Sequence, residues 1–348
     1  MEPINRQRSI FSLLIASVVG LTGACSAEGI ESEDDLSQAA EDEDSDMATD
    51  PDVEPADDPT PLDHDESEEE VFGVAVGDMV EVEDGVLLPV PEPGSMLAID
   101  IMYEDGGTTS ATLAHDTDGR VRIIHPDDHL LGLPEGTAAA CAGKCQDQSF
   151  SYVFGNNTPA KWKSRLNWRY RHANSPVGKT AAINAFKNGA VAVPKSRNSC
   201  NMADQVSATQ SYKGETNVVP SVGVSSGTIF CKAAQSQDGI NVIGWGPLPG
   251  STLAVTCTRA IGDGAVARIT DMDMRYDKAV KWYTGNNPPA SCTDRFSLRG
   301  VATHEFGHAY GLGHTSQCNL VMAPATGDCT SVNRVFGRGD VKGLRSLY

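Results

Sequence analysis

Lysine and arginine are absent from residues 28–118 of this 348-residue chain, a stretch that carries 31 aspartates and glutamates. From residue 119 to the C-terminus the balance reverses, and 25 basic residues stand against 15 acidic ones. The net charge of −20 therefore sums a strongly acidic N-terminal part and a basic C-terminal part. A basic surface can attract nucleic acid, but the chain has no nucleic-acid recognition motif, so we expect no nucleic-acid partner.

The N-terminus lacks an apolar run long enough to cross a membrane. Residues 10–21 form a mainly apolar run of twelve residues, whereas a membrane-spanning helix needs about twenty. A basic start precedes this run and small residues follow it, a pattern typical of an export signal that is removed by cleavage. Residues 21–25 also resemble a bacterial lipoprotein signal, in which the cysteine, here Cys25, is acylated. We therefore expect a protein that is extracellular, or that is attached through Cys25 to the outer membrane or cell surface.

Cysteine is missing from the acidic part, and apart from Cys25 the eight cysteines lie between Cys141 and Cys329. An even number in an exported chain indicates disulfides, but the sequence does not determine which cysteines pair. Cys318 and Cys329 would close a loop of about a dozen residues, stabilising by roughly 3 kcal/mol through chain entropy, and we predict that these two pair. Cys141 and Cys145 alternatively suit a zinc site, although no second close pair accompanies them.

Composition divides the chain into four segments. We predict a signal peptide at residues 1–25. Residues 26–70 are predicted to be a disordered acidic linker, because 21 acidic residues leave too little apolar surface to offset the entropy of ordering. Residues 71–137 contain strand-like stretches separated by Asp-Gly turns, and they are predicted to form a small β-rich module or a pro-region. A larger domain is predicted over residues 138–348.

In the larger domain, hydrophobic periodicity predicts strands and helices. A helix is expected to begin at Ser175 and Pro176, which suit the N-cap and the first helical position, and to end near Gly189. In residues 270–276 apolar side chains alternate with charged ones, which predicts a half-buried strand whose charged face is solvated. The expected fold class is α/β or α+β.

The most specific functional signal is the motif His-Glu-x-x-His-x-x-Gly-x-x-His, which runs from His304 to His314. On a helix, His304 and His308 project from the same face. Gly311 can adopt a positive φ, which would end the helix and turn His314 toward the other two histidines. Three histidine ligands leave a fourth position for water, the arrangement typical of a catalytic Zn²⁺. Glu305 is placed to take a proton from that water.

These eleven residues are those of the metzincin signature, and the chain resembles the matrixin-like metzincins, most closely those of bacteria. Residues 319–324 are similar to the Met-turn, and residues 339–348 are similar to the last matrixin helix. The resemblance implies a zincin-type catalytic domain over residues 138–348, with a twisted mixed sheet, three main helices and Met322 beneath the metal. It also implies an edge strand along the cleft, where an extended substrate would pair by β-augmentation. The residues of this strand are Leu253, Ala254, Val255 and Thr256.

Several matrixin features have no match in this chain. We find no cysteine-switch peptide, no histidines for a structural zinc and no clear calcium loop. Asp271 and Asp273 suit Ca²⁺ as well as they suit a solvated strand face. A second metal, Ca²⁺, therefore stays open without a motif to support it.

We expect a secreted or surface-anchored zinc-dependent endopeptidase that hydrolyses peptide bonds of extracellular proteins. Glu305 would act as the general base on a zinc-activated water and would then pass the proton to the leaving amine. The partners would be protein or peptide substrates. Two alternatives stay open: a surface binding protein whose β-rich module engages a partner, and an inactive relative that keeps the motif.

Overall fold

The computed structural model describes residues 68–104, 108–126, 143–155, 158–232, 239–262, 265–315 and 319–348. All of these residues belong to one compact unit that covers Thr60–Tyr348. The predicted signal peptide, most of the predicted linker, Cys25, Cys141 and Cys318 lie outside the described residues. Within the described residues, no helix is long and apolar enough to cross a membrane.

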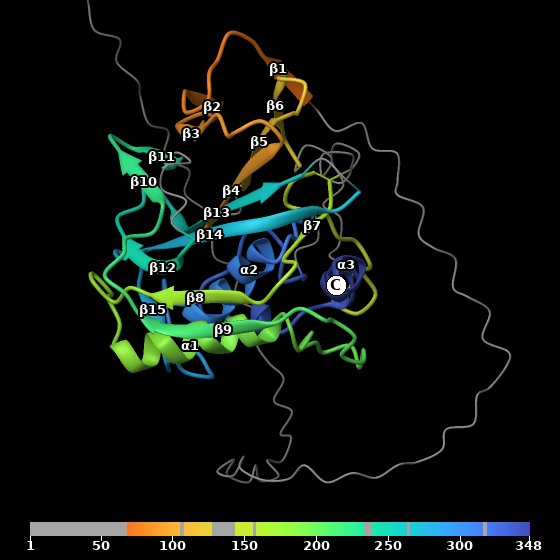
Figure 1. Ribbon diagram of the computed structural model, residues 1–348. Helices are drawn as coiled ribbons and strands as arrows, with labels where there is room; N and C mark the ends of the chain where they lie inside the picture. The colour runs from red at the N-terminus through yellow and green to blue at the C-terminus, as the bar shows by residue number, and fades with distance from the viewer. Residues whose placement is uncertain are drawn as a thin grey trace, which may run out of the picture. The chain divides into compact units, whose positions relative to one another are not determined.

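One large mixed sheet runs through this unit (Figure 1). Its strands lie in the order β1-β6-β5-β4-β13-β14-β12-β8-β9, and the short β7 pairs with β14. Neighbouring strands from β1 to β14 are antiparallel, whereas β14, β12, β8 and β9 are parallel to one another. The strands are β1 (Glu68–Val71), β4 (Ser95–Tyr103), β5 (Thr108–His115), β6 (Val121–Ile124), β7 (Ala160–Lys161), β8 (Leu166–Tyr170), β9 (Gln210–Glu215), β12 (Asn241–Gly246), β13 (Thr252–Ile261) and β14 (Ala267–Asp277).

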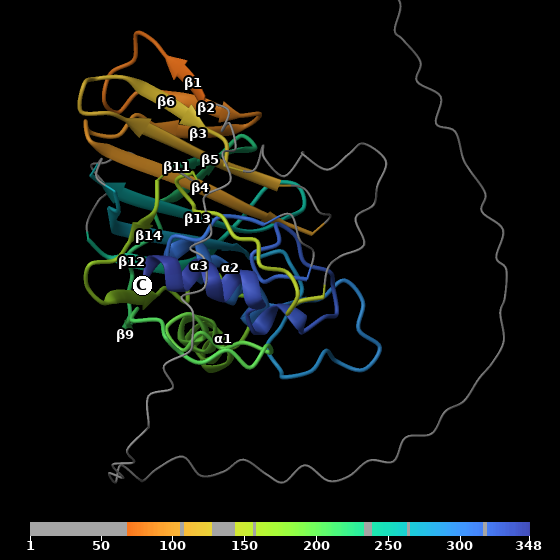
Figure 2. The same ribbon diagram turned by 90° about the vertical axis from the view of Figure 1, so that its right-hand side faces the viewer.

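Three helices lie beside the C-terminal strands of this sheet, away from the end formed by β1, β6, β5 and β4 (Figure 2). They are α1 (Lys179–Ala192), α2 (Leu298–Ala309) and α3 (Arg338–Leu347), with a short 3₁₀ helix, η3 (Val332–Arg334), before α3. The main core between the helices and the sheet contains large, fully buried aromatic side chains: Trp168, Tyr170, Phe186, Trp245, Tyr276 and Phe306. The expected α/β class with a mixed sheet and three main helices is confirmed.

The strands predicted in the N-terminal module are present, but they share their sheets with the C-terminal part. β4 pairs with β13 in the large sheet. In a second sheet the order is β10-β11-β3-β2, and β11 of the C-terminal part pairs with β3 of the module. The strands of this second sheet are β2 (Met79–Glu83), β3 (Val86–Pro89), β10 (Val222–Ser225) and β11 (Thr228–Cys231). A third sheet has two strands, β15 (Trp282–Tyr283) and β16 (Phe296–Ser297).

One apolar core joins the module to the C-terminal part. Leu97 and Ile99 of β4 pack in the same cluster as Val255 and Cys257 of β13. The predicted boundary at residue 137 therefore separates segments that bury apolar surface against each other. At its other end the module begins earlier than predicted, because residues 68–70 of the predicted linker lie in β1.

Helix α1 begins three residues later than predicted, at Lys179. Ser175 does not cap it; its hydroxyl instead closes a tight local turn, accepting from the backbone N–H of Val177 and donating to the carbonyl of the same residue. Such local bonds compete with helix capping. Gly189 does not end the helix, because α1 continues to Ala192. A methyl group on Gly189 would lie 2.9 Å from the backbone carbon of Ala302, so this glycine allows α1 to approach α2 closely.

The prediction that one face of β14 is solvated is wrong. Asp271 and Asp273 are 4% and 3% exposed. β12 and β13 flank β14 on both sides, and the Asp273 carboxylate accepts from the backbone N–H of Val242. Asp271 lies 4.0 Å from the guanidinium of Arg259. Asp271 and Asp273 are thus buried against partners, and among the described residues neither belongs to a group of ligand atoms close enough together to hold a metal.

The predicted pairing of Cys318 with Cys329 is also wrong, because Cys329 forms a disulfide with Cys292. Two loops that are distant in sequence lie side by side here, since the backbone N–H of Cys329 donates to the carbonyl of Arg295 at 2.7 Å. Loop length favoured the nearer cysteine, but tertiary proximity decides which thiols meet. The other disulfides among the described residues are Cys145–Cys200 and Cys231–Cys257.

Candidate metal centre

Helix α2 carries the first two histidines of the motif in a fully buried position. The Ser297 hydroxyl caps the helix by accepting from the backbone N–H of Gly300 at 3.1 Å. His304 and His308 lie one turn apart and are both 0% exposed. Gly311 has φ +98°, and a methyl group there would lie 2.3 Å from the carbonyl oxygen of Ala160. The expectation that this glycine ends the helix with a positive φ is confirmed.

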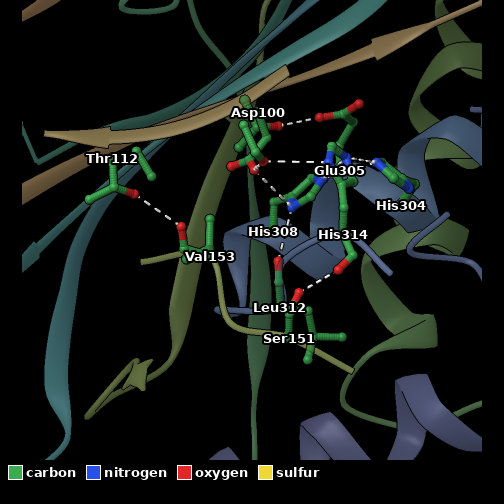
Figure 3. A network of polar contacts seen from close by, with 12 residues as sticks. Asp100, Thr112, Ser151, Val153, His304, Glu305, His308, Leu312 and His314 are labelled. Atoms are coloured by element: carbon green, nitrogen blue, oxygen red, sulfur yellow. Dashed lines mark hydrogen bonds and ion pairs between the residues drawn. The ribbon is translucent and has the colours of Figure 1, made fainter. Parts of the chain in front are cut away.

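The three histidine rings converge on one point (Figure 3). The Nε2 atom of His308 lies 2.9 Å from that of His304 and 3.2 Å from that of His314. The Nε2 atoms of His304 and His314 are also 3.2 Å apart. Zn–N bonds of about 2.0–2.1 Å in a tetrahedron place neighbouring nitrogens about 3.3 Å apart. The donor set therefore fits Zn²⁺. Among the described residues, these three histidines form the group whose ligand atoms lie close enough together to hold one metal ion.

Hydrogen bonds on the far side of two rings orient their metal-facing nitrogens. The Nδ1 atom of His304 donates to the carbonyl of Val321 at 2.7 Å, and that of His308 donates to the carbonyl of Leu312 at 2.9 Å. These bonds leave the Nε2 lone pairs free to bind a cation. Burial lowers the pKa of His304 to about 3 and that of His308 well below its ordinary value. Both imidazoles are therefore neutral, the form that binds metal.

Glu305 lies beside the histidines, and its two carboxylate oxygens differ in their hydrogen bonding. Its Oε2 atom accepts a hydrogen bond from the hydroxyl of Thr256 on β13. Its Oε1 atom is buried and has no hydrogen-bond partner among the described residues. Burial raises the pKa of Glu305 to about 8, and the charge of Asp100 contributes in the same direction. A carboxylate of this kind can accept a proton near neutral pH.

Met322 packs against the helix that carries the first two histidines. It is 1% exposed and packs against Gly307 of α2, where a methyl group would lie 2.2 Å from the Met322 sulfur. The backbone around it is held by Asp340 of α3, whose carboxylate accepts from the backbone N–H groups of Val321 at 3.0 Å and Met322 at 3.2 Å. Sequence reasoning missed Asp340, although a single acid in the first turn of the last helix was a visible signal.

The strand predicted to be the substrate edge is not at an edge in this structure. Residues 252–261 of β13 pair with β14 on one side and with β4 on the other. Thr256 lies opposite Asp100 in this register. The expectation for Leu253, Ala254, Val255 and Thr256 is corrected accordingly, because the N-terminal module supplies a strand that the resemblance did not predict.

Two residues of the module reach the histidines, and sequence reasoning missed both. The carboxylate of Asp100 is 1% exposed and lies 3.5 Å from the Nδ1 atom of His308 (Figure 3). The hydroxyl of Ser110 on β5 donates to Asp100 and lies 3.4 Å from the Nδ1 atom of His314. One signal was available: Asp100 is the sole acid in the apolar run of residues 97–103. An acid in such a strand is buried only where it finds polar partners.

Comparison with known proteins agrees with this geometry. Residues 258–348 match the Peptidase_M10 family, described as matrixin. This part of the chain is a matrixin-like metzincin. The matrixin-like segment contains the three histidines, Glu305 and Met322, whereas Asp100 and Ser110 precede it.

Relatives of the matrixin-like segment come from animals and plants. The chain is 32% identical to matrilysin of Homo sapiens over 100 residues, which are 29% of this chain and 33% of the relative. It is 37% identical to matrix metalloproteinase-20 of Homo sapiens over 76 residues, 22% of this chain and 14% of the relative. It is 36% identical to metalloendoproteinase 1 of Glycine max over 81 residues, 23% of this chain and 26% of the relative. The chain thus spans a third or less of the length of these relatives.

Proposed function

We propose that this chain is a zinc-dependent endopeptidase that hydrolyses peptide bonds of extracellular proteins, with Glu305 as the general base. One observation carries the proposal: three buried Nε2 atoms converge within 3.2 Å of one another beside a buried carboxylate oxygen that has no partner among the described residues. The matrixin-like segment covers all of these residues.

His304, His308 and His314 would hold the zinc. When bound, Zn²⁺ polarises a substrate carbonyl and lowers the pKa of water. The positive charge of the metal also favours the carboxylate form of Glu305, against the burial that raises its pKa to about 8. Thr256 orients the carboxylate through Oε2, so that Oε1 is the atom that takes a proton from water and returns it to the leaving amine.

We propose an extracellular location for the mature protein. The pattern of an export signal over residues 1–25 supports it, as do the disulfides of the described part, which persist in oxidising compartments. Acylation of Cys25 stays a prediction, because this residue lies outside the described part of the chain.

The test compares cleavage of casein and gelatin by wild type, Glu305→Gln and His308→Ala, with the zinc content of each variant. It is carried out on the intact chain and after limited proteolysis, because all four site residues are 0–1% exposed in the form described here. Wild type should lose activity with a chelator. Glu305→Gln should retain about one zinc and lose cleavage, whereas His308→Ala should lose both. A zinc-loaded Glu305→Gln variant that cuts as fast as wild type would overturn the role of Glu305.

A further inference from the structure

Strand β4 occupies the whole outer edge of β13. The two strands pair antiparallel from Ser95 opposite Ile261 to Tyr103 opposite Thr252. An extended peptide can bind a protein by adding one strand to a free sheet edge, using the same backbone groups. Since β4 already uses these groups, β13 cannot accept a second strand on that side. In this form the edge beside the metal centre is filled by the chain itself.

The site beneath this pairing is closed to substrate. His304 and His308 are 0% exposed, and Glu305 and His314 are 1% exposed. Asp100 stands opposite Thr256, the residue that holds the Glu305 carboxylate. A side chain of β4 is therefore buried in the position from which a substrate would have to reach Glu305.

We propose that β4 is a built-in occupant of the substrate-binding edge, so that the form described here is latent and becomes active when β4 leaves β13. This inference rests on the proposed endopeptidase function. Asp100 is the residue that positions β4 against β13 beside the metal centre. With Zn²⁺ bound, its carboxylate would lie near a positive charge that favours keeping it buried.

The sheets show where the structure would separate. The disulfide Cys231–Cys257 joins β11 to β13, so both strands stay with the metal centre. The strand pairings that must part are the β4–β13 ladder and the shorter pairing of β3 with β11 at Val86 and Leu87. The contacts of Asp100 with His308 and of Ser110 with His314 must part as well. Release also exposes apolar side chains such as Val255, which packs with the module. If β4 leaves β13, the whole module, which comprises the strands β1 to β6, therefore leaves with it.

The first experiment places a recognition sequence for a specific protease between residues 127 and 142, which lie outside the described part of the chain. The full-length protein is then nicked, and the portion freed of the module is isolated by size-exclusion chromatography. Deuterium exchange of residues 252–261 reports whether β13 is covered, and a short fluorogenic peptide reports cleavage. An open form populated at about 0.1–10% in the intact chain predicts a rise in kcat/KM of about 10- to 1000-fold.

The second experiment uses the intact chain and does not require the freed part to stay folded. Asp100→Asn keeps the size of the side chain and removes its charge. Its matched control is Glu70→Gln, an exposed acid of the same module on β1. Removal of zinc with a chelator should speed deuterium exchange of residues 252–261 in wild type and in Glu70→Gln. In Asp100→Asn the exchange should already be faster with zinc, and the chelator should change it less.

The two readouts separate this inference from the proposed function. Faster exchange of β13 together with faster peptide cleavage supports both. If exchange rises in the freed protein but no peptide is cut, the inference about β4 stands and the endopeptidase function is wrong. If the intact chain cuts the short peptide as fast as the freed protein, β4 does not occlude the site. Equal exchange in Asp100→Asn and Glu70→Gln, with and without zinc, overturns the role of Asp100.

Discussion

The contact between Gly307 and Met322 offers a sharp test of how the metal centre is supported. A methyl group on Gly307 would lie 2.2 Å from the Met322 sulfur and 2.9 Å from its terminal methyl carbon. Inserting a carbon into such a packed position costs about 1–3 kcal/mol, while alanine in place of glycine favours a helix by about 1 kcal/mol. We therefore expect Gly307→Ala to be less stable than wild type by about 0–2 kcal/mol.

Gly300 provides the matched control on the same helix. A methyl group there would lie 3.2 Å from the nearest atom, the Cβ of Ser297, so only a small adjustment is needed. Gly300→Ala keeps the gain in helix propensity, and the two variants should differ by about 1–3 kcal/mol in urea unfolding. The metal centre should respond as well, because displacing Met322 moves the neighbouring carbonyl of Val321 that orients His304 at 2.7 Å.

Zinc affinity measured by competition with a chromophoric chelator is the second readout of this test. Loss of an outer-shell partner typically lowers metal affinity about 10- to 100-fold, and we expect Gly307→Ala to fall in this range while Gly300→Ala binds zinc like wild type. If the two variants were equally stable and bound zinc equally, Met322 would not support the histidines through Gly307, and the packing argument would be refuted.

Three further predictions concern other parts of the domain. Burial raises the pKa of Asp340 from 3.8 to about 6, so the contribution of this group to stability is complete below pH 3.8 and is lost as the pH rises through 6. The melting temperature of Asp340→Asn should therefore change less between pH 4 and 7 than the melting temperature of wild type. An equal change in both proteins would contradict this prediction. Peptide mapping without reduction should recover Cys292 joined to Cys329; a peptide joining Cys329 to another cysteine would show this pairing to be wrong. Gly311→Ala should destabilise the fold by more than about 1 kcal/mol, because the position has φ +98° and a methyl group would meet the Ala160 carbonyl. If the variant unfolded at the same urea concentration as wild type, the position would not be strained by a side chain.

Local spacing made the metal centre predictable. His304 and His308 are four residues apart, so any helix through them presents both rings on one face. Gly311 allows the positive φ that turns the chain, and His314 follows it at the distance needed to reach the same point. A single stretch of the sequence thus predicts the helix α2, the cation that suits three imidazoles and the position of Glu305.

Pairing between distant segments was beyond such reasoning. Cys329 joins Cys292, and Asp271 is buried beside Arg259, because two stretches of chain meet only in the folded state. In the same way β4 lies along β13, which places Asp100 against His308 although they are far apart in the sequence.

The sequence by itself thus determined the ligands, the helix that carries them and the class of metal chemistry, because helical periodicity is a property of neighbouring residues. Only the tertiary structure decided which strand covers β13 and whether the site is open. The physical reason lies in the backbone, whose N–H and C=O groups are the same in every strand. A free edge can therefore pair with a substrate or with a strand of its own chain, and burial of apolar side chains such as Leu97 and Ile99 against Val255 selects the strand that lies there.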